Sequence, residues 1–205
     1  MSRVIVHGAG GNTRTVIGVL LESWKRDEII CMDKQAYPRE RILGVEVYKE
    51  IIYQKDDMHL VSLGDNLMRS EKVKELLFQK HKITYCISNS ATIFDMNQVE
   101  KHNNMIFCGV YLGPETIIGS NNIINTRCVL EHEVKIGDNN HIAPTACLCG
   151  RVEIGNNIFI GANVTVKEKI RICDNVTIGA GAVVVENINE SGVYVGIPAR
   201  KVETE

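Results

Sequence analysis

The chain has 205 residues, 44% of them hydrophobic, and its formal charge of −2 comes from 23 basic and 25 acidic side chains. This balance argues against a general affinity for nucleic acid or for anionic membranes. No apolar run approaches the roughly 18 residues of a membrane-spanning helix, and the apolar stretch at the amino terminus is too short for a signal peptide. We therefore expect a soluble cytoplasmic protein with no membrane insertion and one large or two small domains.

The first part of the chain alternates strand-like and helix-like segments. Strands are predicted at residues 4–6, 28–32, 59–63 and 83–87, and helices over 16–24 and around Val73, Leu76 and Leu77. Such alternation predicts a parallel sheet with ligand-binding loops at the strand ends. We expect residues 1–86 to form an α/β, Rossmann-like domain.

The glycine-rich turn at residues 8–11 follows the first strand and precedes the first helix. It could present N–H groups to a phosphate, or it could be only a tight strand-to-helix turn. Thr13 occupies the place of the last glycine of a dinucleotide fingerprint. Arg14 and Arg69 stand early in their helices and could reach phosphates, although such arginines are more often solvated.

From Ile106 onward the chain follows a period of six. Every sixth residue up to Val184 is aliphatic, which gives fourteen positions: Ile106, Leu112, Ile118, Ile124, Leu130, Ile136, Ile142, Leu148, Ile154, Ile160, Val166, Ile172, Ile178 and Val184. This period is typical of a β-helix, in which the aliphatic residues fill the axis. An ordinary β-sandwich would not keep so strict a spacing, so residues 87–205 are predicted to form an all-β left-handed parallel β-helix.

A longer repeat of eighteen residues relates Asn121, Asn139, Asn157 and Asn175, which implies three hexads per coil with asparagine at a corner. Nothing interrupts the register, so no loop should protrude and an active site would have to use the flat faces, where two prisms meet. After Gly192, residues 193–200 are expected to leave the repeat.

Seven cysteines occur without a CxxC pair, so we expect free thiols in a reducing compartment. Cys147 and Cys149 would share one face of a strand. A metal site needs more ligands at suitable spacing, so no metal is expected.

The hexapeptide series and the ending at residues 195–202, VGIPARKV, resemble the bacterial hexapeptide acyltransferases. The whole chain is similar to the nucleotide-amino-sugar N-acetyltransferases of surface-glycan synthesis, such as the UDP-4-amino-sugar acetyltransferases of the bacillosamine pathway. The most specific stretch is 129–137, followed by His141. The resemblance implies acetyl transfer from acetyl-CoA to an amino group, expected at position 4, of a nucleotide-linked deoxy-amino sugar.

The resemblance also implies roles for single residues and an assembly. His132 would be the general base and Glu133 the carboxylate that orients it, while His141 would lie beside the thioester of acetyl-CoA, with Ala162 and Arg171 farther along the coenzyme. The nucleotide sugar would contact Gly10, Gly11, Asn12, Asp33, Lys34, Gly64 and Leu67. Asn12, Thr13 and Lys34 depart from the family pattern, which continues Gly-His-Gly in the turn and places an acidic residue after Asp33. Family members are trimers with coenzyme between neighbouring prisms, so we expect a homotrimer.

The residues themselves support proton transfer at His132. An amine that attacks a thioester must lose a proton, and histidine, with a reference pKa of about 6.5, is suited to accept it. A carboxylate on one ring nitrogen fixes the tautomer and frees the other nitrogen. In an extended strand Glu131 and Glu133 would point away from His132, so the orienting carboxylate either reaches around a corner or comes from a stacked coil.

Other functions fit parts of the pattern. The same base would serve an O-acetyltransferase of a sialic-acid-like sugar. A β-helix carbonic anhydrase would need three histidines on Zn²⁺, and only His132 and His141 lie in the regular coils. A non-catalytic sugar-binding protein would bind the nucleotide sugar without releasing CoA. The remaining histidines, His7, His59, His81 and His102, have no partner motif and are expected to be structural.

Overall fold

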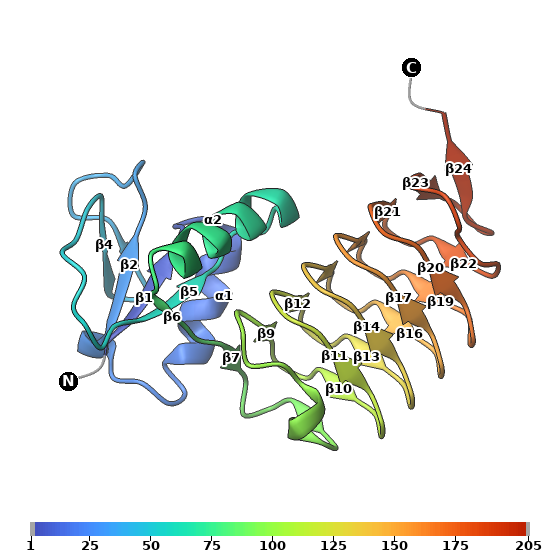
Figure 1. Ribbon diagram of the computed structural model, residues 1–205, viewed down its shortest axis with the longest axis horizontal. Coiled ribbons are helices and arrows are strands. Elements are labelled where there is room, and N and C mark those ends of the chain that lie inside the picture. Colours follow the sequence, from blue (N-terminus) through green and yellow to red (C-terminus); the bar gives the residue numbers. More distant parts are fainter. Residues whose placement is uncertain (1–2, 204–205) are drawn as a thin grey trace.

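The computed structural model describes residues 3–203 and consists of an α/β unit followed by a prism of stacked coils (Figure 1). Neither of its two α-helices, α1 (Gly11–Leu20) and α2 (Asn66–Phe78), has the length and hydrophobicity needed to cross a bilayer. Two short 3₁₀ helices, η1 (Arg26–Glu28) and η2 (Met96–Gln98), complete the helical elements of the described residues.

The α/β unit is built on a six-stranded sheet in the order β3-β4-β2-β1-β5-β6. The strands are β1 (Val4–His7), β2 (Ile29–Met32), β3 (Arg41–Ile42), β4 (Val45–Tyr48), β5 (Met58–Val61) and β6 (Lys82–Ile83). All neighbours are parallel except β3 and β4. Because α1 follows β1 and α2 follows β5, the turns that begin both helices lie at the same edge of the sheet, as predicted for an alternating pattern.

Both helices differ in detail from the sequence prediction. Helix α1 begins at Gly11 and ends at Leu20, and Trp24 packs partly buried on the core beyond its end. Helix α2 buries Arg69, Val73 and Leu76, which lie on one face at a spacing of four and three. Leu77 also belongs to this helix, as predicted, but its side chain lies around the helix from this row and is 43% exposed.

The segment 83–87, predicted as one strand, is divided between two sheets. Lys82–Ile83 forms β6 at the edge of the α/β sheet, whereas β7 (Cys86–Ile87) pairs with the prism. The predicted limit between residues 86 and 87 therefore falls within β7. Both halves of the segment are apolar, so periodicity alone could not show that they serve different sheets.

The prism has three faces, and all of their strands are parallel to their neighbours except the last one. The first face contains β8 (Thr92–Ile93), β10 (Tyr111–Leu112), β13 (Val129–Leu130), β16 (Cys147–Leu148), β19 (Thr165–Val166) and β22 (Val183–Val184). The second face contains β11 (Ile117–Ile118), β14 (Lys135–Ile136), β17 (Glu153–Ile154) and β20 (Arg171–Ile172). The third face contains β7, β9 (Met105–Ile106), β12 (Ile123–Ile124), β15 (His141–Ile142), β18 (Phe159–Ile160), β21 (Val176–Ile178), β23 (Gly192–Val195) and β24 (Arg200–Val202).

The core of the prism is the predicted column of aliphatic residues. All fourteen positions from Ile106 to Val184 belong to one buried cluster, and none is more than 5% exposed. Each coil adds its strand in parallel register to the coil before, as in the pairing of Ile142 with Ile124 and Ile160. The predicted parallel β-solenoid of hexapeptide repeats is therefore confirmed.

One corner of the prism carries a ladder of asparagines. Asn121, Asn139, Asn157 and Asn175 all have φ between 56° and 60°, the left-handed conformation that asparagine tolerates. Each of the first three donates its amide Nδ2 to the Oδ1 of the next, at 2.9, 3.2 and 2.7 Å. These bonds run along the prism and join coils that are eighteen residues apart.

The two parts of the molecule dock through the third face. Met105, Phe107 and Ile123 belong to the same buried cluster as the apolar residues of the α/β unit. Farther along this face, Phe159 and Thr177 are exposed. Residues 193–195, which were expected to leave the repeat, still extend the third face, because β23 pairs in parallel with β21, and the following segment then turns back.

Candidate active site

His132 lies at the corner between the first and second faces, just after β13, and 52% of its side chain is exposed. Glu133 has a φ of 61° and turns the chain at this corner. Its carboxylate therefore reaches back, and Oε2 lies 3.0 Å from Nδ1 of His132. The sequence left open whether the orienting carboxylate reaches around the corner or comes from a stacked coil. In the structure the carboxylate of Glu133 reaches around the corner.

Arg151, from the next coil, fixes this carboxylate by donating from Nε to Oε2 of Glu133 at 2.8 Å. The hydrogen bond from His132, and then Arg151, lower the pKa of Glu133, so the carboxylate is ionised near neutral pH. When Nδ1–H of His132 donates to it, Nε2 keeps its lone pair. The corner thus has the geometry of a carboxylate-oriented base.

Gly150 lies directly against the His132 ring, one coil farther along the prism. A Cβ atom at this glycine would lie only 2.5 Å from Cε1 and from Nε2 of the imidazole. Any residue larger than glycine would therefore displace the ring. Sequence analysis missed this contact, although its signal is the interval of eighteen residues between His132 and Gly150.

His141 projects from β15 on the third face. Its Nδ1 lies 3.1 Å from the carbonyl oxygen of Gly64 and therefore donates to it, while Asn125 donates from Nδ2 to Nε2 at 3.3 Å. The ring meets Phe159 edge to face, with centroids 5.2 Å apart. Burial lowers the pKa of His141 to about 4, so the ring is neutral near pH 7.

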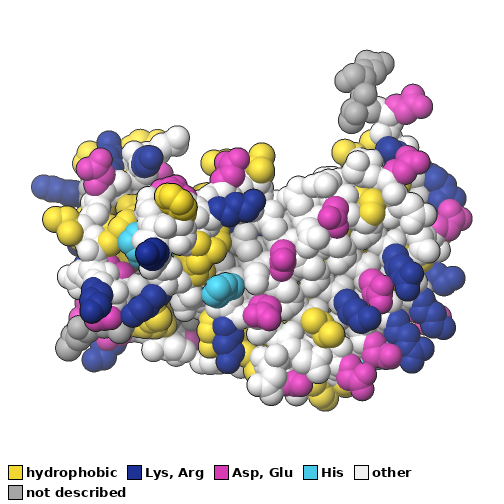
Figure 2. Space-filling view, in the orientation of Figure 1, with side chains coloured by type: hydrophobic (Ala, Val, Ile, Leu, Met, Phe, Trp, Pro, Cys, Tyr) yellow, Lys and Arg dark blue, Asp and Glu magenta, His cyan; other side chains and the backbone are white. Residues whose placement is uncertain are grey.

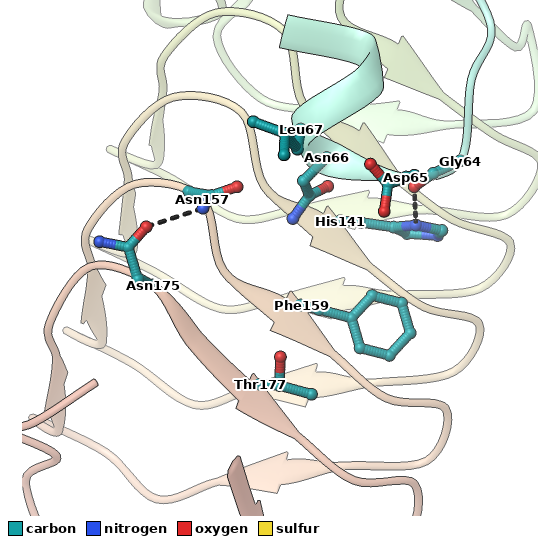
Figure 3. Close-up of a pocket in the computed structure, with 9 residues that line it drawn as sticks. All are labelled: Gly64, Asp65, Asn66, Leu67, His141, Asn157, Phe159, Asn175 and Thr177. Carbon is teal, nitrogen blue, oxygen red and sulfur yellow. Dashed lines mark hydrogen bonds between the residues drawn. The ribbon is translucent and has the colours of Figure 1, made fainter. Parts of the chain in front are cut away.

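A pocket of about 590 Å³ opens beside His141. Figure 3 shows its two sides: the start of α2 and the preceding loop lie above, and side chains of the coils lie below. The lining residues are Gly64, Asp65, Asn66, Leu67, His141, Asn157, Phe159, Asn175 and Thr177. The expectation that flat faces alone would form a site is wrong for this pocket, because the docked α/β unit supplies one wall.

The pocket brings together three residues that the sequence had singled out, Gly64, Leu67 and His141. It also contains Asp65 and Phe159, which sequence analysis missed. His132 is absent from the lining and stands at a different corner of the same prism. Within one chain, the structure therefore does not bring the two candidate histidines of the coils into one pocket.

Two of the predicted nucleotide-sugar residues, Gly10 and Asp33, line a second pocket, of about 220 Å³. The carboxylate of Asp33 accepts from the backbone N–H groups of Ala9 and Gln35, both at 2.8 Å. These bonds tie the glycine turn to the end of β2. Gly11 is the first residue of α1, and a Cβ atom added to it would meet no atom within 4 Å.

The other predicted residues of this region do not line the second pocket. Asn12 donates from Nδ2 to the carbonyl oxygen of Ser62 at 2.9 Å, which ties the turn to the end of β5. Lys34 is exposed beyond β2. Leu67, in the larger pocket, is 62% exposed.

The remaining predicted coenzyme contacts lie elsewhere on the prism. Ala162 stands in the turn between the third and first faces. Arg171 projects from the second face, where its Nε lies 3.2 Å from Oε2 of Glu153. Lys167 and Lys169 are exposed nearby in the chain, and Figure 2 shows basic side chains gathered over the carboxyl-terminal coils.

Arg69, His7 and His59 are polar residues buried inside the protein. Arg69 neither reaches solvent nor is free to bind a phosphate, since it is fully buried and hydrogen-bonded within the protein. His7 and His59 are buried, with Nε2 of the first 2.9 Å from Nδ1 of the second, as expected of structural residues. Among residues 3–203, no three histidine, cysteine or acidic side chains are grouped to hold a metal ion.

Comparison with known proteins matches the coils to a family described as bacterial transferase hexapeptide (six repeats), over residues 115–150 and 151–186. A comparison with curated proteins found no match.

Three solved structures are similar along nearly the whole chain. One is the acetyltransferase domain of PglB from Neisseria gonorrhoeae, with 22% identity, a TM-score of 0.88 and coverage of 98% of this chain and 99% of that chain. The same domain in complex with acetyl coenzyme A has 23% identity, a TM-score of 0.87 and coverage of 98% of both chains. A mutant of perosamine N-acetyltransferase from Caulobacter crescentus, in complex with CoA and GDP-perosamine, has 26% identity, a TM-score of 0.86 and coverage of 98% and 97%. These likenesses confirm the resemblance drawn from the sequence.

Proposed function

We propose that this chain, which has the hexapeptide repeats and the fold of bacterial sugar N-acetyltransferases, acetylates the amino group of a nucleotide-linked deoxy-amino sugar with acetyl-CoA as co-substrate. The observation that carries the proposal is the imidazole of His132, held by Glu133 at Nδ1 with its Nε2 free to accept a proton. The binding of CoA and GDP-perosamine by the similar perosamine N-acetyltransferase supports this acceptor class.

In the proposed reaction His132 acts as the general base. Acetyl-CoA supplies the acetyl group as a thioester, whose C–S bond breaks as the new C–N bond forms, and CoA leaves as its thiolate. The proton lost by the acceptor nitrogen passes to Nε2 of His132, and the imidazolium then gives it to the thiolate, which forms the thiol of CoA. Glu133 fixes the tautomer and stabilises the imidazolium that results.

We assign the two pockets to the two substrates. The acetyl end of acetyl-CoA would lie beside His141, where Phe159 gives the 590 Å³ pocket an apolar surface for the adjoining chain of the coenzyme, while Gly64 and Leu67 of the same pocket would face the sugar. Ala162 and Arg171 would contact the coenzyme farther along the prism. The nucleotide sugar would be held by the residues at the ends of β1, β2 and β5, namely Gly10, Gly11, Asn12, Asp33, Lys34, Gly64 and Leu67.

We further propose that the site is completed in a homotrimer. His132 and His141 occupy different parts of one prism, so an acceptor near both requires His132 from one chain and His141 from its neighbour. Sedimentation should give a trimer. A stable monomer with full activity would contradict this arrangement.

We also propose that the α/β unit is a Rossmann-like domain and that the coils are left-handed. The strand order of the α/β unit, with β1 at the centre and crossover helices after β1 and β5, supports a Rossmann-like nucleotide-sugar domain over residues 1–86. Residues 87–205 would be the acetyltransferase domain, with coils of left-handed sense. All seven cysteines are free thiols, which suits a reducing compartment such as the cytoplasm.

The experiment that tests the proposal is a panel of acceptors. UDP-, GDP- and dTDP-linked 4-amino sugars, their 4-hydroxy counterparts and a sialic-acid-like sugar are each incubated with acetyl-CoA, and free CoA and product mass are followed. We expect CoA release and an acetylated product with at least one amino sugar. Acetylation of hydroxy acceptors alone, or binding of nucleotide sugars without CoA release, would overturn the proposal.

A further inference from the structure

Arg69 is fully buried where α2 meets the prism. All three nitrogens of its guanidinium donate hydrogen bonds to oxygen atoms of the protein. Nε donates to the carbonyl of Asn121 at 3.2 Å, Nη1 to the carbonyls of Leu63 and Gly64 at 3.1 and 3.3 Å, and Nη2 to the carbonyl of Asn140 at 3.1 Å. Nη2 also donates to Oδ1 of Asn66 at 2.7 Å.

These bonds fix the loop 63–66 against two successive coils of the prism. Asn66 extends the attachment to a third coil, since its Nδ2 donates to the carbonyl of Ile158 at 3.0 Å. A buried cation without an ion-pair partner is costly, and Arg69 makes no salt bridge among the described residues. A planar fork of five N–H groups is suited to this many carbonyls, which a lysine could not satisfy.

The carbonyl oxygen of Gly64 links this arrangement to His141. It accepts from Nη1 of Arg69 and also from Nδ1 of His141, at 3.1 Å. The ring therefore carries its proton on Nδ1, and Nε2 is a hydrogen-bond acceptor at the pocket.

The positive charge of Arg69 also favours the neutral form of the His141 ring. Burial is the main cause of the lowered pKa of His141, and the nearby guanidinium lowers it further, against the effect of the Gly64 carbonyl. Asp65, which lines the same pocket, is the acidic group at this end of α2. The neighbouring strands bring Ile123 and Phe159 beside His141, and neither is charged.

We propose that Arg69 is a positioning residue, which holds the 63–66 loop as a wall of the pocket and keeps His141 a neutral acceptor toward the acetyl donor. The inference rests on the proposed placement of acetyl-CoA beside His141. In this structure Asn125 donates to Nε2 of His141 at 3.3 Å. With the ring neutral, an amide N–H of the coenzyme could take the place of Asn125 as donor to Nε2, whereas an imidazolium would offer a donor there. From the sequence alone, Arg69 could have contacted a phosphate. In the proposed site Arg69 instead acts through His141.

The first test needs no variant and no substrate. Nitrogen NMR of His141 in the wild-type protein should show a neutral ring protonated at Nδ1 at pH 7. A ring protonated at Nε2, or one that titrates near the reference pKa of about 6.5, would overturn the proposal. Because this readout does not depend on acetyl transfer, it stands apart from a failure of the proposed function.

The second test separates charge from placement with Arg69→Met and Arg69→Lys. Loss of the cation in Arg69→Met should raise the pKa of His141, whereas Arg69→Lys should keep it low. Both should lower kcat/KM for acetyl-CoA, by about 100-fold if the wall moves by an ångström. The control is Lys74→Met, which removes an exposed cation from the same helix. Wild-type kcat/KM and an unchanged His141 pKa in Arg69→Met would contradict the role.

Discussion

At the scale of single residues, the most sensitive contact of the proposed base is with Gly150. The His132 ring lies where a Cβ of this residue would stand, and the ring can rotate away at little cost, since it ends a flexible and exposed side chain. We therefore expect Gly150→Ala to lower kcat by up to about 100-fold, the lower end of what a general base contributes. The free energy of unfolding should change by less than about 1 kcal/mol.

The control is Gly18→Ala in α1, where an added Cβ would make an ordinary contact of 3.8 Å with Leu43. Acetyl-transfer rates and urea unfolding of the two variants check the prediction. Wild-type kcat in Gly150→Ala would show that the ring does not act from this position.

Residue chemistry explains which site residues the sequence could predict. His132 and Glu133 are adjacent, so their pairing needs only the turn between them. Gly150 and Arg151 approach them from the next coil, and the sequence carries only one signal of this contact, the interval of eighteen residues. Arg69 could not be predicted, since its burial depends on carbonyl groups of a distant part of the chain.

At the scale of elements, the asparagine ladder is expected to stabilise the stacking of coils. Asn139 accepts from Asn121 and donates to Asn157 with φ near 60°. Asn139→Ala loses both bonds and places a Cβ-bearing residue without a polar side chain in the left-handed region, so we expect a loss of about 2–3 kcal/mol in unfolding free energy. Asn139→Gly loses the bonds but relieves the backbone and should lose about 1 kcal/mol.

Urea unfolding of both variants measures these losses. Equal stability of the alanine and glycine variants would show that backbone conformation is not a determinant at this corner. The prediction has no bearing on acetyl transfer, so kcat of both variants should stay near the wild-type value.

The repeated strands of the prism could be predicted from the sequence, whereas contacts between distant parts of the chain could not. Each coil repeats the same local rule, so the column from Ile106 to Val184 could be placed from spacing alone. The division of residues 83–87 between two sheets depends on how the α/β unit docks on the prism. The same docking forms the 590 Å³ pocket, which is why the sequence indicated Gly64 and Leu67 only through resemblance.

At the scale of the whole molecule, buried neutral histidines should make stability fall in acid. Burial lowers the pKa of His7 to about 3 and those of His59 and His141 to about 4. Between these values and the unfolded pKa of about 6.5 the unfolded chain binds more protons, so stability is present above pH 6.5 and is lost as the pH falls. At pH 5 each group should lower the free energy of unfolding by as much as about 2 kcal/mol.

Urea unfolding between pH 7.5 and about 4.5 checks this slope, and His59→Leu should flatten it. The exposed His102 serves as the control, since His102→Gln should leave the slope unchanged. A wild-type stability that is constant over this range would contradict the neutral, buried state of these rings.

The central claim is that His132 takes the proton of the attacking amine, and the most direct measurement is the rate of acetyl transfer by His132→Ala. With the amino sugar on which the wild-type protein is active, we expect kcat to fall by about 100- to 10,000-fold while acetyl-CoA still binds. The kcat of Glu133→Gln should fall by a smaller factor, because the base remains but loses its orienting carboxylate. A His132→Ala protein that transfers acetyl groups at the wild-type rate would contradict the account.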